Sequence, residues 1–226
     1  MVLTSRFVVT VAVPVIAAVG AIAGGVLLGN NRAEADANDG GVSSVSVNRM
    51  TDASVIDATS STLARTKNGI TATLQTQELE AGDAYTLWWV IFNHPENCEY
   101  PIPGITSCGE GDVFAQPLGD TDVKVSVQYA GGNIVGGTGR VDFGAYLQEG
   151  VTPDAPGQLV FGSGLIDSKK AEVHLVVRSH GRVFPPMEGT QLSTFGGACT
   201  AETDPTDAGP EGPRECADVQ FAAHIP

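Results

Sequence analysis

The stretch of the chain with the most side chains capable of chemistry is residues 171–181, AEVHLVVRSHG, which contains His174, Arg178 and His180. Imidazole is the commonest metal ligand in proteins, so a metal site is one hypothesis. In a regular strand His174 and His180 would share one face at roughly 20 Å from each other. Zinc–nitrogen bonds are about 2.0–2.1 Å long, so one ion cannot bind both. We favour two histidines that are hydrogen-bonded to their neighbours, although each could join a separate site.

Arg178 and His180 are two positions apart on the same predicted face. With an anionic ligand they would form an anion-binding site, because a guanidinium binds carboxylates and phosphates strongly. The alternative is a structural arginine paired with a carboxylate. We prefer it because the chain has 12 Lys and Arg against 26 Asp and Glu, a net charge of -14.

Two more histidines, His94 and His224, extend the metal hypothesis. A blue-copper site needs two His and one Cys, usually with a Met. His94, Cys98, Met187 and His224 supply these types but not in one compact loop. A copper or zinc site that uses some of the four histidines therefore stays an alternative, without a specific spacing to support it.

Acidic loops could bind calcium through their oxygen atoms. One candidate is the loop that contains Glu202, Asp204, Asp207, Glu211 and Glu215, and a second is residues 119–122, GDTD. Neither has the EF-hand pattern, so we interpret both as solvated acidic loops. We predict no cofactor, with calcium, copper and zinc left open.

Motifs of other function classes are missing from the sequence. It contains no Gly-x-Ser-x-Gly, no His-Glu-x-x-His and no Walker-type Gly-Lys-Ser/Thr. The acidic composition argues against a nucleic-acid partner, since affinity for phosphate backbones comes mainly from Lys and Arg. We therefore assign no catalytic residue.

The first 37 residues differ in composition from the rest. Residues 7–29 form an apolar run without a charge, and residues 33–37, AEADA, offer small residues for cleavage. A run of this length can also span a bilayer, which takes about 20 residues. We predict a signal peptide or an N-terminal membrane anchor at 1–37, a hydrophobic helix outside the fold. Either would export the remainder to the envelope, the cell surface or the medium.

Four cysteines lie in the part that would be exported: Cys98, Cys108, Cys199 and Cys216. An even number in an oxidising compartment indicates two disulfides. We favour Cys98–Cys108 and Cys199–Cys216, because each pair encloses a loop rich in Pro and Gly.

Alternating apolar and polar residues dominate the chain after residue 40. Residues 122–129 and 140–147 alternate and flank the turn-rich sequence GGNIVGG, which predicts a hairpin. Residues 217–225 alternate as a last strand, and a strand from residue 70 follows a Lys67-Asn68-Gly69 turn. Residues 85–92 are apolar at both parities, which predicts a central strand with Trp88 and Trp89 on opposite faces.

Many short strands with frequent turns predict an all-β fold, an antiparallel β-sandwich that is Ig-like or jelly-roll-like. A linker at 38–44 would precede a single domain at 45–226. The segments AYTLWWVIFNHPENC, AEVHLVVRSHG and CADVQFAAH resemble those of uncharacterised exported microbial β-sandwich proteins over about a sixth of the chain. This resemblance implies no activity, substrate or site.

Three hypotheses about function follow. The first is an exported, non-catalytic binding or structural module of the envelope or the extracellular space, with an unidentified ligand and with residues 7–29 as a membrane anchor if they are retained. The second is an exported copper or zinc protein that uses histidines. The third is a secreted enzyme whose site is assembled from loops.

Overall fold

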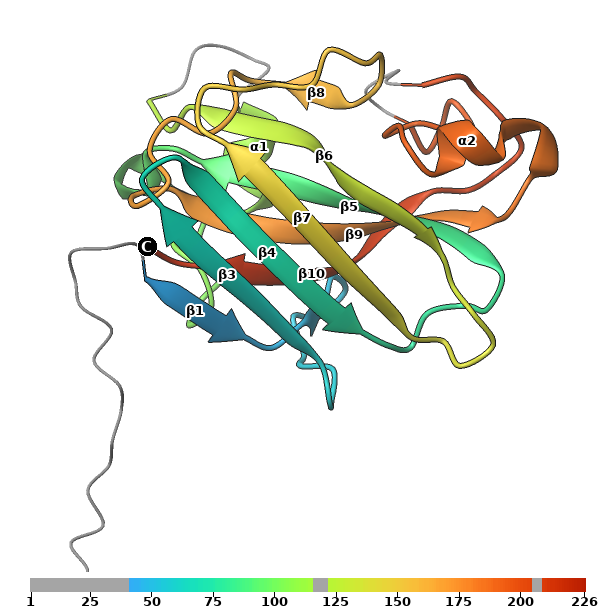
Figure 1. Cartoon of the computed structure of the whole chain (residues 1–226), viewed down its shortest axis with the longest axis horizontal. Coiled ribbons are helices and arrows are strands. Elements are labelled where there is room, and N and C mark those ends of the chain that lie inside the picture. Colours follow the sequence, from blue (N-terminus) through green and yellow to red (C-terminus); the bar gives the residue numbers. More distant parts are fainter. Residues whose placement is uncertain (1–40, 116–121, 205–208) are drawn as a thin grey trace, which may run out of the picture. The chain divides into compact units, whose positions relative to one another are not determined.

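The computed structural model describes residues 41–115, 122–204 and 209–226. Contacts divide the chain after Glu34, and every described residue belongs to the unit that begins at Ala35. This unit consists of two β-sheets in which all pairs of neighbouring strands are antiparallel (Figure 1). The predicted antiparallel β-sandwich is confirmed.

The four-stranded sheet has the order β1-β3-β4-β7, with β1 at Val42–Val45, β3 at Ser60–Thr66, β4 at Gly69–Thr76 and β7 at Val141–Gln148. The six-stranded sheet has the order β2-β10-β9-β5-β6-β8, with β2 at Asn48–Arg49, β10 at Ala217–His224, β9 at Glu172–Arg182, β5 at Asp83–Phe92, β6 at Val125–Ile134 and β8 at Leu159–Phe161. The loops of the described ranges contain short helices: η1 at Pro95–Asn97, α1 at Glu110–Ala115, η3 at Pro185–Met187 and α2 at Glu188–Gln191.

The main core lies between the two sheets. Alternate residues of β4 point into it, among them Ile70 and Leu74, and β5 contributes Trp89 from the facing sheet. Residues of one parity face one side of a strand, so the alternation of the sequence accounts for this layer directly. The inward residues of β9 that the pattern predicted, Val173, Leu175 and Val177, also lie here.

A second core lies on the outer face of the six-stranded sheet, the face turned away from the four-stranded sheet. Trp88, Phe92 and Phe221 belong to it, together with Cys108 from a loop. Trp88 and Trp89 are each 1% exposed, and they lie in different cores. The prediction for residues 85–92 is confirmed, because β5 pairs with both β6 and β9 and is covered on both faces.

Both predicted disulfides are present in the predicted pairing. Cys98 bonds to Cys108 and Cys199 bonds to Cys216, with Cα–Cα distances of 5.1 and 5.5 Å. Cys98 packs against the outer core and Cys108 is part of it. The disulfides close loops of about 10 and 17 residues, which stabilises the fold by restricting the unfolded chain.

The predicted hairpin of residues 122–129 and 140–147 is wrong. β6 pairs with β5 and β8, whereas β7 pairs with β4 in the other sheet. Two of the glycines expected in the turn, Gly131 and Gly132, lie inside β6, which continues to Ile134. A Cβ at Gly132 would lie 2.1 Å from the carbonyl oxygen of Leu192, so the absence of a side chain serves close packing there. Alternation shows which face of a strand is buried but not which strand lies beside it.

The predicted linker at 38–44 overlaps the first strand of the fold. Strand β1 begins at Val42 and pairs with β3 from Val42 opposite Ala64 to Val45 opposite Ser61. Residues 42–44 of the predicted linker therefore belong to an edge strand, in which Val42 and Ser44 are exposed and Ser43 faces the other sheet. The segment at 1–37, including the apolar run at 7–29, lies outside the described residues. Across the ranges that the structure describes, no helix is long and apolar enough to cross a membrane.

Candidate functional site

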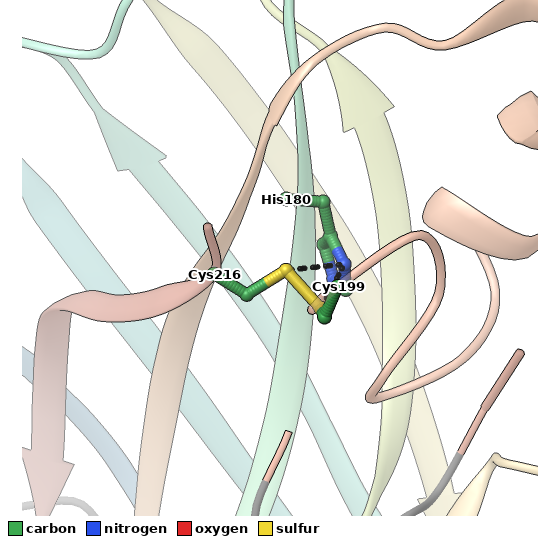
Figure 2. A group of neighbouring side chains, drawn as sticks. All are labelled: His180, Cys199 and Cys216. Atoms are coloured by element: carbon green, nitrogen blue, oxygen red, sulfur yellow. Dashed lines mark hydrogen bonds between the residues drawn. A yellow bond between two sulfur atoms is a disulfide. The ribbon is translucent and has the colours of Figure 1, made fainter. Parts of the chain in front are cut away.

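The histidine at the end of β9, His180, lies beneath the Cys199–Cys216 loop and is fully buried (Figure 2). Its Nε2 is 2.8 Å from Oγ1 of Thr86 on β5, and its Nδ1 is 3.1 Å from the carbonyl oxygen of Gly197. The sulfur atoms of Cys199 and Cys216 lie 3.6 and 3.8 Å from the same Nδ1. His180 therefore joins the central strands to the loop that covers them.

The pattern of donors and acceptors fixes the protonation of His180. A carbonyl oxygen only accepts, so Nδ1 carries the hydrogen and donates to Gly197. Trp88 Nε1 donates to Thr86 Oγ1 at 2.7 Å, which leaves the Thr86 hydroxyl hydrogen for the lone pair on His180 Nε2. Burial, and to a smaller extent the charge of Arg178, lower the pKa of His180 to about 4. The ring is neutral at physiological pH, which suits a structural link.

Arg178, two residues before His180, is 4% exposed. Its Nη1 donates to Asp218 at 3.0 Å, and its Nε and Nη2 donate to the carbonyl oxygens of Phe195 and Thr203. The guanidinium also lies 4.0 Å from the ring centroid of Phe195. All three nitrogens thus hold protein groups, which supports the structural alternative over the anion site proposed for Arg178 and His180.

His174 lies at the other end of β9, where its Nε2 is 2.8 Å from Oε1 of Glu172. Glu172 is fully buried and also accepts from the backbone N–H groups of Ser107 and Cys108 at 3.1–3.2 Å. Burial alone would raise the pKa of Glu172, but the interactions with His174 and with these N–H groups outweigh it, so the pKa is lowered. The pair fixes the Cys98–Cys108 loop to the outer face, as the His180 group fixes the other loop.

His224, on the last strand, faces the space between the two sheets. Its ring nitrogens lie 2.8 Å from Oγ of Ser43 and 2.8 Å from Oγ of Ser61, on two strands of the facing sheet. Arg65 donates to the His224 carbonyl oxygen at 3.1 Å. Burial lowers the pKa of His224 to about 4, with smaller effects from the charges of Arg65 and His174. This neutral histidine therefore links one sheet to the other.

The four histidines do not meet. His94 is half-exposed beside Glu96, at 3.2 Å, and the other three are buried in the separate settings described above. Two groups of three ligand atoms do occur in the described ranges, His180 with Cys199 and Cys216, and Cys98 with Cys108 and Asp112. In both groups the sulfur atoms are joined in a disulfide, whereas metals bind thiolates. Neither group is a metal centre in this oxidised form.

The acidic loops considered for calcium are only partly described. Asp207 and residues 119–121 lie outside the described residues, and Asp122 is exposed. Glu202, Glu211 and Glu215 are also exposed, as expected for solvated carboxylates, whereas Asp204 is 6% exposed.

The surface of the described ranges includes two open hollows. One, of about 500 Å³, lies where the ends of β4, β6 and β7 meet and is lined by Ala58, Gln75, Thr76, Gln77, Asn133, Ile134, Arg140, Val141 and Asp142. The other, of about 400 Å³, borders α1 and is lined by Asn97, Glu99, Tyr100, Asp112, Ala115, Asp122 and Val123. His174, His180 and His224 line neither hollow, so the buried histidines are not accessible from either one.

Sequence reasoning missed the partners of these histidines. Glu172 could have been found, because it is two residues from His174 and shares its face of the strand. The sequence does not indicate a role for Thr86, because this residue lies within an otherwise apolar strand. Ser61 gave none either, since it lies 163 residues from His224 in the chain.

No known protein family, no curated protein and no solved structure matches this chain.

Proposed function

We propose that this chain is an exported, non-catalytic β-sandwich module that acts as a binding or structural domain at the cell envelope or outside the cell. The observation that carries the proposal is the use of its reactive side chains. His174, Arg178, His180 and His224 all hold loops or sheets together within the protein. Catalysis would need such groups at a surface that a substrate can reach.

Export is supported by the two disulfides and by the sequence before the domain. Disulfides persist in oxidising compartments and are rare in the cytosol. Cys98 and Cys108 pack in the outer core, and Cys199 and Cys216 are both buried, so both bridges are part of the fold and not incidental surface bonds. The apolar run at 7–29 would direct the chain across the membrane and would anchor it there if it is retained.

The metalloprotein alternative receives less support. It needs two or more histidines around one ion, and each histidine has separate partners in the described ranges. The loop-assembled enzyme lacks a described hollow that contains a buried histidine or arginine. A scaffold with rigid loops fits the arrangement better.

The test combines localisation, thiol state and metal content of the full chain. Cells that express it are treated with a thiol-blocking reagent and fractionated, and the protein is weighed by mass spectrometry and analysed for copper and zinc. We expect it outside the cytoplasm with four unblocked cysteines and well below one ion per chain. The matched control is a chain that lacks residues 7–29, which should stay in the cytoplasm.

Recovery of the full chain in the cytoplasm with blocked cysteines would overturn the export proposal. Stoichiometric copper or zinc would overturn the non-metal function and support the second hypothesis.

A further inference from the structure

The four edge strands of the two sheets differ in length. β1 has four residues, β2 has two and β8 has three, whereas β7 has eight. An edge strand offers unpaired N–H and C=O groups to other strands, and proteins limit this by short strands, lysines or prolines. The sequence of β7, VDFGAYLQ, contains neither lysine nor proline. β7 is therefore the one long, unguarded edge among the described strands.

The direction of the β7 backbone groups follows from its register. Thr66 and Gly69 close the two-residue hairpin of β3 and β4, so the odd-numbered residues of β4 bond to β3 and the even-numbered ones to β7. Since Ile70 lies opposite Leu147, the odd-numbered residues of β7 bond to β4. The even-numbered ones direct their N–H and C=O groups away from the sheet: Asp142, Gly144, Tyr146 and Gln148.

Bonds beyond the strand agree with this alternation. The N–H of Glu149 donates toward β4, to Asn68, and that of Gly150 donates the other way, to Leu165 at 2.8 Å. The free edge thus ends where Leu165 occupies it. Within the described ranges, no hydrogen bond found beyond the β4–β7 pairing uses the outward groups of residues 142–148. A Cβ at Gly144 would meet no atom within 4 Å, so the surface beside it is open.

We propose that a second copy of this chain pairs with this edge, β7 against β7, to make one continuous sheet of two four-stranded halves. An antiparallel pairing with Ala145 opposite Ala145 uses every outward group from 142 to 148. Four pairs of residues would then exchange roughly eight N–H···O bonds. A twofold interface of this kind closes on itself, because the β7 edge of each copy is used up, and only the short β1 strands remain at the two ends of the joined sheet.

The side chains suit this register. Tyr146, which is 59% exposed, comes to lie opposite Gly144, so an aromatic ring covers each glycine. Asp142 comes to lie opposite Gln148, which places an amide beside each carboxylate and no like charge. At the centre the two Ala145 residues form the closely spaced type of pair, at about 4.5 Å between Cα atoms, where a small side chain fits.

Other registers and partners are less favourable. A shift by two residues places Gly144 opposite Gly144 in one direction and Tyr146 opposite Tyr146 in the other, and both shifts leave outward groups at a strand end unpaired. An unrelated extended peptide could pair with the backbone, but it would not supply the Tyr146 ring for Gly144. The charge of -14 on each copy opposes association, so added salt should strengthen the dimer by screening.

The contact is a single strand pair, smaller than a standard interface of about 800 Å² per partner, so the dimer should be weak. The test is sedimentation equilibrium of the full chain, solubilised in the same way for every variant, at concentrations up to about 1 mM and at low and high salt. We expect a dimer that forms reversibly and more readily at high salt.

The variant Gly144→Pro removes an outward N–H group and blocks pairing at this edge. It should be monomeric at every concentration. The matched control is Ser44→Pro, at an exposed position of β1, the edge strand on the opposite side of the sheet. The N–H of Arg65 on β3 donates to Gly41, so the odd-numbered residues next to β3, such as Ser43, bond to it, and the N–H of Ser44 points outward. This control should dimerise like the parent.

A second measurement does not depend on the fold tolerating proline. Ala145→Cys should give a disulfide-linked dimer on non-reducing gels, because the proposed Cα distance lies within about 4.4–6.8 Å. Thr71→Cys, on the neighbouring strand β4, is the control and should stay monomeric. A parent that is monomeric throughout, a dimer that survives Gly144→Pro, or equal cross-linking of both Cys variants would each overturn the proposal.

Discussion

Thr86 and His180 lie 94 residues apart in the chain, yet Oγ1 of one and Nε2 of the other are 2.8 Å apart inside the protein. The hydroxyl also accepts from the indole of Trp88 at 2.7 Å. A single oxygen therefore satisfies two buried nitrogens, one on its own strand and one on the next. Loss of this oxygen leaves both nitrogens without the partner they have in the fold.

Thr86→Val keeps the shape of the side chain and removes the hydroxyl. We expect a loss of about 2–4 kcal/mol in the free energy of unfolding, because two buried polar groups lose their partner. Chemical denaturation measures it. Thr71→Val, at an exposed position of β4, is the control and should change little. Equal midpoints for the parent and Thr86→Val would show that the hydroxyl is not needed.

Acid should destabilise the fold through His180 and His224, whose pKa values are lowered to about 4 by burial and by the charges of neighbouring arginines. In the unfolded chain the value is about 6.5. Since the folded values are lower, the stabilisation is complete above pH 6.5 and is lost as the pH falls through about 4. Each histidine should account for roughly 3 kcal/mol over this range.

The measurement is chemical denaturation at about pH 7.5 and about pH 4.5. His224→Gln can still hydrogen-bond to serine but cannot gain a proton, so its loss of stability in acid should be smaller than that of the parent. His94→Gln, at a half-exposed position, is the control and should behave like the parent. An identical loss in His224→Gln and the parent would contradict the assignment.

Trp88→Ala and Trp89→Ala should each cost about 3–5 kcal/mol in the free energy of unfolding, because both side chains are 1% exposed and each fills a different core. Phe114→Ala is the control, since that ring is 60% exposed. Denaturation midpoints of the three variants give the comparison. If either tryptophan variant unfolds at the midpoint of the parent, the corresponding core does not support the fold.

Gln128 is fully buried, and neither polar atom of its amide has a hydrogen-bond partner among the residues that the structure describes. Gln128→Leu should therefore be neutral or should stabilise the protein by about 1–3 kcal/mol, since burial of an unpaired amide is unfavourable. Gln220→Leu is the matched control, because that buried amide bonds to Thr76 and Gln77 at 2.6 and 2.8 Å. It should destabilise. If Gln128→Leu destabilises equally, the Gln128 amide has a partner such as bound water.

Much of the fold could be predicted from the sequence where the information is local. The parity of residues along a strand placed Trp88 and Trp89 in separate cores, and the Pro- and Gly-rich loops indicated which cysteines pair. The choice of neighbouring strands could not be predicted, because β7 has the same pattern whether it pairs with β4 or with β6. The site was missed for the same reason, since contacts such as Ser61 with His224 join distant parts of the chain.

The separation of the two indoles has a practical consequence for spectroscopy. Trp88 belongs to the core that the loops cover, with the ring of Phe195 at 5.0 Å, whereas Trp89 is enclosed between the sheets. If a reductant opens the disulfides and the loops lift, water reaches Trp88 first. The intrinsic fluorescence of this chain should therefore report whether the loops are closed. Emission from Trp88 would change when they lift, whereas emission from Trp89 would stay the same and serve as the reference.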